Sequence, residues 1–148
     1  MRHLRRYEPS DEPSVLELWW TSWHSIAPTL VHPEPREAWK DRWQSEICPS
    51  HEVVIALDDE LNIVGFAAAN LARSELAQLF VSPRSKRQGI GGELLSWGKQ
   101  VMPAGFTLHT LTQNLASRAF YRNHGLREGS RRINSFNGLE TVEYRWTR

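Results

Sequence analysis

The chain of 148 residues holds a single cysteine, Cys48, so no disulfide can form within it and no cysteine pair offers metal-ligand spacing. No His-rich cluster offers such spacing either, so we expect no metal site. The 18 Lys and Arg nearly balance the 17 Asp and Glu. This excludes the strong basic excess that drives binding to nucleic acid or anionic lipid. A small molecule is the expected partner, and a lone thiol suits a reducing cytoplasm.

Long apolar runs are also missing. Charged residues continue from the N-terminus through Glu12 without an apolar stretch of signal-peptide length, so we expect no secretion signal. The longest apolar stretch, around residues 63–69, falls far short of the roughly 20 residues that a spanning helix needs. No linker or repeat divides the chain. We therefore expect one cytoplasmic domain over residues 1–148, with no membrane partner.

The order of helix-like and strand-like segments predicts an α/β fold. Alternating and β-branched stretches predict strands at residues 4–7, 53–57, 63–67, 75–81, 106–112, 133–136 and 141–146. Apolar spacing and capping residues predict helices at about residues 13–25, 36–47, 91–100 and 115–124. This order implies a mixed sheet of about seven strands, covered on both faces by about four helices.

Tryptophan is abundant, with seven in the chain. Five lie in the first two predicted helices: Trp19, Trp20, Trp23, Trp39 and Trp43. Most should fill the core between these helices and the sheet. The apolar positions of the first helix cover an arc of about 200°, which is wider than one buried stripe needs. At least one ring, Trp20 or Trp23, is therefore expected to line a cleft and to suit an ammonium group or a flat ring.

The most informative stretch, residues 79–95, combines the end of a strand, three cationic side chains and three glycines at the start of a helix. Glycines let backbone N–H groups approach a ligand closely, and the helix dipole is positive at this end. The stretch therefore predicts an anion cradle. No third glycine follows Gly89 and Gly91 at the spacing of the dinucleotide fingerprint, and the Gly-Lys-Ser/Thr ending of a P-loop is missing. A plain tight turn is the alternative for the glycines alone.

This stretch resembles the pyrophosphate loop of the GNAT superfamily of N-acetyltransferases, where Val-x-Pro precedes Arg/Gln-x-x-Gly-x-Gly/Ala and a helix with paired leucines. Here Val81 and Pro83 precede the loop, and Leu94 and Leu95 follow it. Lysine replaces the family's usual arginine or glutamine at the first loop position, which keeps the charge but loses the planar fork. The resemblance implies that the loop binds the pyrophosphate of coenzyme A through Lys86, Arg87, Gln88, Gly89, Gly91 and Gly92.

A second segment, residues 114–126, is similar to the family's later motif of an asparagine, Ala-x-x-Phe-Tyr and a glycine at the helix end. The resemblance thus spans most of the chain and implies the GNAT fold, a mostly antiparallel sheet splayed between the fourth and fifth strands. It implies that the pantetheine arm lies in this gap against backbone at Leu79 and Val81. A backbone N–H near Leu79 would hold the oxyanion. Asn114 is assigned to the same coenzyme site.

Two residues are assigned to catalysis through the resemblance. Tyr121 stands where the family places a tyrosine facing the coenzyme sulfur, and a hydrogen bond to the leaving thiolate is its expected role. The alternative is a core aromatic beside Phe120. Glu75 stands at the position of the general-base glutamate of histone-type members. The alternative there is a solvated carboxylate paired with Arg73.

Other catalytic arrangements receive less support. His109 and His24 are weaker candidates for the base, and both are expected to be structural histidines. Cys48 lies outside both motifs and no Ser-His arrangement is visible, so the amine is expected to attack directly.

The sequence as a whole predicts an enzyme that transfers acetyl from acetyl-coenzyme A to a primary amine of a small molecule or peptide. Two other functions stay open: a non-catalytic coenzyme A-binding or regulatory module on the same fold, and a protein N-terminal or lysine acetyltransferase. A strongly acidic acceptor cleft would favour the protein acetyltransferase. The choice between monomer and homodimer also stays open.

Overall fold

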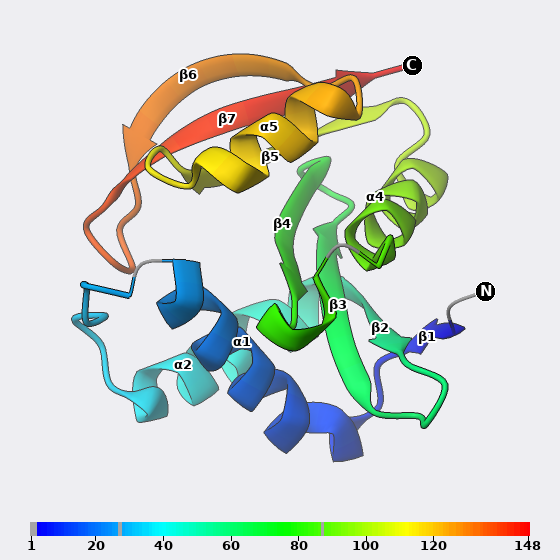
Figure 1. The fold of residues 1–148 in the computed structure, drawn as a ribbon, viewed down its shortest axis with the longest axis vertical. Coiled ribbons are helices and arrows are strands. Elements are labelled where there is room, and N and C mark those ends of the chain that lie inside the picture. The colour runs from blue at the N-terminus through cyan, green and yellow to red at the C-terminus, as the bar shows by residue number, and fades with distance from the viewer. Residues whose placement is uncertain (1–2, 27, 87) are drawn as a thin grey trace.

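A computed structural model describes residues 3–26, 28–86 and 88–148 and shows one mixed sheet with helices on both faces (Figure 1). The strands lie in the order β1-β2-β3-β4-β5-β7-β6. All neighbouring strands are antiparallel except β4 and β5, which are parallel. The strands are β1 (His3–Arg6), β2 (Glu52–Leu57), β3 (Ile63–Asn70), β4 (Glu75–Val81), β5 (Gly105–Leu111), β6 (Arg127–Ile133) and β7 (Glu140–Thr147). The predicted fold class and element order are confirmed.

The helices are α1 (Glu12–Ile26), α2 (Arg36–Arg42), α3 (Cys48–Ser50), α4 (Ile90–Val101) and α5 (Leu115–Asn123). The predicted helix at residues 36–47 changes to π-helical geometry at η2 (Trp43–Ile47) before it reaches α3. Two 3₁₀ turns, η1 (Pro9–Asp11) and η3 (Pro83–Ser85), precede α1 and the glycine loop. None of the helices in the described ranges is both long and apolar enough to cross a bilayer.

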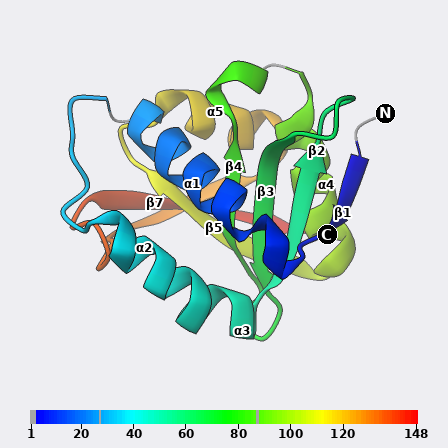
Figure 2. The ribbon, with the colours of Figure 1, turned by 90° about the horizontal axis from the view of Figure 1, so that it is seen from below.

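The two faces of the sheet carry separate cores because successive side chains of a strand point to opposite faces. Val54 and Ala67 belong to the core beneath α4 and α5. Their neighbours Ile55 and Phe66 belong to the core beneath α1 and α2. Figure 2 shows α1 crossing β3 and β4, in agreement with its contacts to both strands. The near-continuous burial of β3 follows from this double cover.

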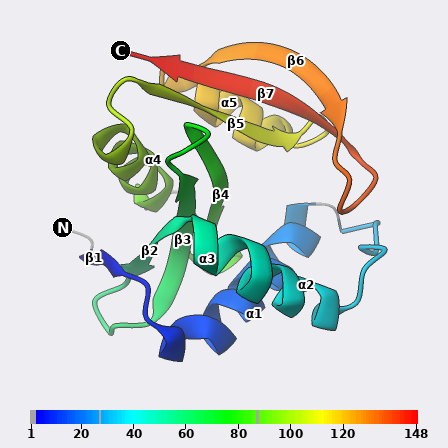
Figure 3. The same cartoon turned by 180° about the vertical axis from the view of Figure 1, so that it is seen from behind.

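The sheet divides between β4 and β5. These strands pair at one position, Glu75 with Thr107. Figures 1 and 3 show β5, β6, β7 and α5 grouped on one side of this division, and β1 to β3 with α1 and α2 on the other. In β4 the partners of Ala68 and Ala69 are Gln78 and Leu76, so Ala77 is an extra residue and forms a bulge. The predicted splay is therefore present, and a bulge lies beside it.

The predicted bounds of the sixth strand were wrong. We predicted a strand at residues 133–136, whereas β6 ends at Ile133 and residues 134–139 form the loop to β7. Every residue of β6 is exposed, so the strand lacks the alternation of apolar and polar residues on which the prediction depended. Phe136, which we had placed in the strand, instead packs against Trp39 with ring centroids 5.6 Å apart.

Candidate active site

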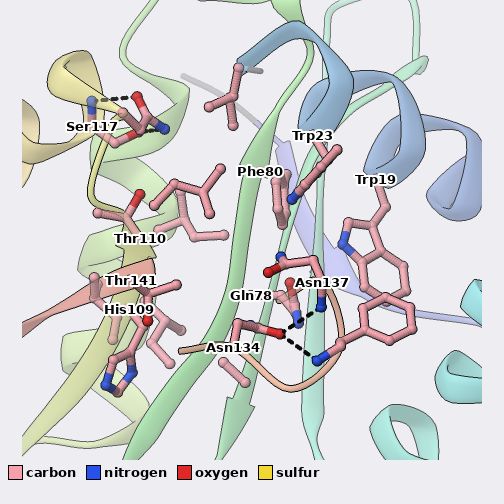
Figure 4. A pocket seen from close by; sticks show the side chains of 18 of the residues that line it. Trp19, Trp23, Gln78, Phe80, His109, Thr110, Ser117, Asn134, Asn137 and Thr141 are labelled. Atoms are coloured by element: carbon pink, nitrogen blue, oxygen red, sulfur yellow. Dashed lines mark hydrogen bonds between the residues drawn. The ribbon is translucent and has the colours of Figure 1, made fainter. Parts of the chain in front are cut away.

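A cleft of about 170 Å³ opens where β4 and β5 separate. Its walls come from α1, α2, the chain between them, β4, β5, α5 and the β6–β7 loop. In Figure 4, Trp19 and Trp23 of α1 lie on one side of β4, and His109 and Thr110 of β5 lie on the other. The cleft therefore lies between the two halves of the divided sheet.

The glycine loop leads into α4, as predicted. Gly89 is the N-cap of α4 with φ of +83°, a left-handed conformation that side chains rarely adopt. Because Gly89 has no side chain, it makes no capping hydrogen bond to the first backbone N–H groups of α4. These N–H groups can then bind an anion. A Cβ added at Gly91 would lie 3.2 Å from Cζ of Phe120. The first of these glycines is thus required by backbone conformation and the second by close packing.

The other predicted loop residues are less constrained. Lys86 and Gln88 are exposed, and a Cβ at Gly92 would make an ordinary contact with His124 at 3.5 Å. Arg87 lies outside the described residues. Lys86, Gln88 and Gly92 do not line the cleft. The assignment of all these loop residues to coenzyme binding stays a prediction.

The two strand residues that were predicted to contact the pantetheine arm differ in their position relative to the cleft. Leu79 lines the cleft, whereas Val81 does not. The Val81 carbonyl accepts a 3.3 Å hydrogen bond from the Ser22 hydroxyl of α1. Ala77 at the bulge also lines the cleft. The bulge is not predictable from the sequence, because an alanine among apolar residues carries no bulge signal.

Tyr121 is buried and lines the cleft. Its ring lies beside Phe120 and Tyr144, with centroids 5.4 and 5.6 Å away. Burial raises the pKa of the Tyr121 phenol above its usual value. The two readings of this residue are therefore compatible, because it packs in the core and also faces the cleft as a neutral phenol.

The helix that carries Tyr121 is fixed at its start. Asn114 is the N-cap, and its Oδ1 accepts from the Ser117 backbone N–H at 3.1 Å. The Arg118 guanidinium donates to the Thr112 carbonyl at 3.0 Å and to Glu128 at 3.0 Å. Asn114 also lines the cleft. Its observed role is capping, and its contact with a coenzyme stays a prediction.

Glu75 lies at the cleft within a charged group. Its Oε2 is 3.8 Å from Nδ1 of His109 and 3.8 Å from Nη2 of Arg132. The arginine beside Glu75 is thus Arg132 and not Arg73, which the sequence offered as the alternative partner. Nε2 of His109 lies 4.0 Å from Oε2 of Glu143.

His109 is kept neutral by its surroundings. Burial lowers the pKa of His109, and the positive charge of Arg132 lowers it further, against smaller opposing effects of Glu75 and Glu143. Arg132 was absent from our prediction, and its position in the exposed strand β6 gave no signal. The site therefore pairs a carboxylate with a neutral imidazole.

A cluster of rings forms the other end of the cleft. We call Trp23, His32, Trp39 and Phe136 the aromatic box. The His32 ring centroid lies 4.9 Å from that of Trp23 and 4.6 Å from those of Trp39 and Phe136. Of the two rings predicted to line the cleft, Trp20 or Trp23, Trp23 does so, and Trp19 and Trp39 line it as well.

Trp20 and His24 lie outside the cleft lining. Trp20 is half-buried, with the Arg36 guanidinium 4.8 Å from its ring centroid. Nδ1 of His24 lies 2.8 Å from the Trp20 carbonyl oxygen, a hydrogen bond within α1. His24 is a structural histidine, as expected.

The sequence model of the Acetyltransferase (GNAT) family matches residues 13–126. The chain belongs to this family, whose general activity is acetyl transfer. No curated protein matches the chain significantly.

Solved structures show the same fold. The GCN5-related N-acetyltransferase from Rhodopseudomonas palustris superposes with a TM-score of 0.80 at 21% identity, over 100% of this chain and 96% of the other. The PaiA N-acetyltransferase from Thermoplasma acidophilum, solved with coenzyme A, gives 0.72 at 18% identity over 99% of both chains. The ribosomal-protein-S18-alanine N-acetyltransferase from Escherichia coli gives 0.71 at 17% identity, over 99% of this chain and 94% of the other.

Proposed function

We propose that the protein transfers an acetyl group from acetyl-coenzyme A to a primary amine of a small molecule or peptide. The observation that carries this proposal is the single pairing of β4 with β5 at Glu75 and Thr107. Beyond that pair the edge of β4 is free to bind the amides of an extended arm, as an added strand would. The coenzyme A complex of the PaiA N-acetyltransferase, which shares this fold, supports the choice of coenzyme.

The coenzyme would lie along three elements. The glycine loop and the start of α4 hold the pyrophosphate through Lys86, Gln88 and the backbone at Gly89 and Gly91. The pantetheine arm follows β4, and backbone at the Ala77 bulge and Leu79 holds the thioester oxygen. Asn114 lies across the gap from these strand residues.

The reaction begins with an uncharged amine. A lysine-type ammonium with a pKa of about 10.4 is deprotonated in only about one molecule in 2,000 at pH 7. Glu75 accepts the proton, directly or through water, and the amine attacks the thioester carbon. Collapse of the tetrahedral intermediate releases the coenzyme thiolate, and the attacking nitrogen loses its second proton to solvent. The neutral Tyr121 phenol donates a hydrogen bond to this thiolate.

The raised pKa of Tyr121 favours this hydrogen-bonding role over full proton transfer. A phenol near pKa 10 is already about 2 kcal/mol too weak an acid to protonate a thiolate near 8.5. Burial increases that difference. Tyr121 therefore acts as a donor that keeps its proton, and solvent protonates the departing thiolate.

A protein acceptor is the second candidate, because the S18-alanine N-acetyltransferase shares the fold. A strongly acidic cleft would favour it, but the cationic side chains of Arg42 and Arg132 line the cleft together with Glu75. The charge therefore favours a small acceptor. Thiol release from acetyl-coenzyme A, measured with small amines and with lysine-bearing or free N-terminal peptides, tests both candidates. If the protein binds coenzyme A but releases no thiol from acetyl-coenzyme A with any amine, the result supports a non-catalytic coenzyme A-binding module.

A further inference from the structure

The aromatic box contains two buried N–H groups without partners. His32 and Trp39 are only 4% and 2% exposed, and both line the cleft. Nε2 of His32 and Nε1 of Trp39 have no hydrogen-bond partner within the described ranges. Buried polar groups are nearly always paired in native proteins. Two orphaned nitrogens at one end of a cleft indicate a place where a ligand supplies the missing acceptor.

The tautomer of His32 is set by its surroundings. The Glu34 backbone N–H donates to Nδ1 of His32 at 3.0 Å, so Nδ1 carries no proton. Burial lowers the pKa of His32 to about 4, and the ring is neutral at physiological pH. The single proton is therefore on Nε2. Like the Trp39 indole, His32 offers the cleft a hydrogen-bond donor and no acceptor.

The neighbouring loop fixes the box and adds a further donor. Oδ1 of Asn134 accepts from the backbone N–H groups of Phe136 at 2.7 Å and Asn137 at 3.2 Å (Figure 4). These bonds hold Phe136 against His32. Because the oxygen is occupied twice, the side chain of Asn134 has its Nδ2 hydrogens left to offer. Asn134 also lines the cleft.

An aromatic box can also bind an ammonium group through cation–π contacts. Here a cation already lies beside the box, because the Arg42 guanidinium is 4.5 Å from the Phe136 ring centroid and 5.9 Å from that of the neighbouring Trp19. The carboxylate of the cleft lining is Glu75, which lies beside Arg132 and His109. A polycationic acceptor would meet like charge and unpaired donors at the box.

We propose that the acceptor is an amine that also bears a carboxylate and a flat aromatic ring, as an aromatic amino acid does. The ring packs against the aromatic box from the side of the cleft, since aromatic groups stack offset or edge to face. The carboxylate accepts from Nε2 of His32 and Nε1 of Trp39. The amine is then directed toward Glu75. This inference rests on the proposed acetyl transfer and specifies its acceptor.

The test compares amines that differ only in the carboxylate. Acetylation is measured with phenylalanine against 2-phenylethylamine, with tryptophan against tryptamine, and with spermidine as a polycation. We expect kcat/KM to be about tenfold or more higher for the carboxylated member of each pair, because a charged acceptor strengthens a buried hydrogen bond. Equal or better rates with the decarboxylated amines or spermidine would overturn the inference and leave acetyl transfer established.

Variants of His32 test whether its Nε2–H donates to the carboxylate of the acceptor. His32→Phe keeps a ring and removes the N–H, so the preference for phenylalanine over 2-phenylethylamine should fall by about tenfold. His32→Gln restores a donor and should recover part of the preference. His51→Phe, which lies outside the cleft lining, should leave it unchanged. An unaltered preference in a folded His32→Phe protein would contradict the assignment.

A binding measurement separates this inference from the proposed reaction. Calorimetry with 3-phenylpropionate, which has the ring and carboxylate but no amine, should show binding to the coenzyme A-loaded protein that His32→Phe weakens. If 3-phenylpropionate binds and no amine is acetylated, the box assignment holds and the proposed reaction fails. If acetylation occurs but 3-phenylpropionate does not bind, the reaction holds and the box assignment fails.

Discussion

Oε2 of Glu75, the β4 residue that pairs with Thr107 of β5, lies 3.8 Å from Nδ1 of His109. This distance exceeds a hydrogen bond, so the carboxylate and the neutral imidazole can each contact a water or a substrate proton. Arg132 lies within 3.8 Å of Glu75 and 3.4 Å of His109. The cleft therefore holds two candidate bases, Glu75 and His109, and both lie close to the positive charge of Arg132.

Replacing Glu75 and His109 in turn shows which of them is the general base. Glu75→Gln should lower kcat/KM by about 100-fold at pH 7. The loss should shrink as pH rises, because more of the amine then arrives deprotonated. His109→Gln should cost less than about tenfold if His109 only positions the carboxylate. The measurement is kcat/KM against pH for both variants, and a reversed order of the two losses would make His109 the base.

Tyr121→Phe should lower kcat by about tenfold to 100-fold and leave the Kd of coenzyme A nearly unchanged, because it removes a contact made to the leaving thiolate. Since burial raises the pKa of Tyr121, the loss should stay constant with pH across the assay range. Tyr144→Phe is the matched control. Its hydroxyl donates to Glu128 at 2.9 Å outside the cleft lining, so that change should lower Tm without a selective effect on kcat. A Tyr121→Phe enzyme at full rate would make Tyr121 a packing residue.

Gly89→Asp should weaken coenzyme A binding by about tenfold or more, because it brings a negative charge to the positive end of α4. Gly125→Asp controls for backbone strain. Both glycines have φ of +83° with no atom within 4 Å of an added Cβ, so both changes should lower Tm by similar amounts. Calorimetry with coenzyme A then separates them. Equal Kd values of coenzyme A for the two variants would contradict the proposal that the glycine loop binds the pyrophosphate.

His32 should make stability depend on pH. Its pKa is lowered to about 4 in the folded protein, against about 6.5 for an unperturbed histidine. The unfolded chain therefore binds more protons between these values, and the free energy of unfolding should fall as pH drops from about 6.5 to 4, by up to about 3 kcal/mol. Urea titrations at several pH values measure this slope. In His32→Phe the slope should be shallower over this range, and an identical slope would mean that His32 is not buried as a neutral ring.

Much of the fold was predictable because its signals are local. The helix α4 begins where glycines follow a strand and a basic run, and β4 spans the predicted residues 75–81. The strand β6 was misplaced because an exposed edge strand has no buried face to impose a pattern. The π-helical turn after Arg42 was likewise missed, because its residues continue a helical apolar pattern.

The candidate site was predictable only in part. Tyr121 and Glu75 came from motif positions, and the structure brings both to one cleft. His32, Arg132 and Asn134 were missed because they reach the cleft from two loops and an edge strand that are remote in sequence. Contacts of this kind depend on tertiary packing and carry no periodic signal.

Release of coenzyme thiol from acetyl-coenzyme A in the presence of phenylalanine tests the central claim most directly. The wild-type chain should release thiol in proportion to N-acetylphenylalanine formed, and Tyr121→Phe should slow both equally. Coenzyme A binding without thiol release, on this amine and on every other amine and peptide tried, would contradict acetyl transfer and leave a coenzyme-binding module on the same fold.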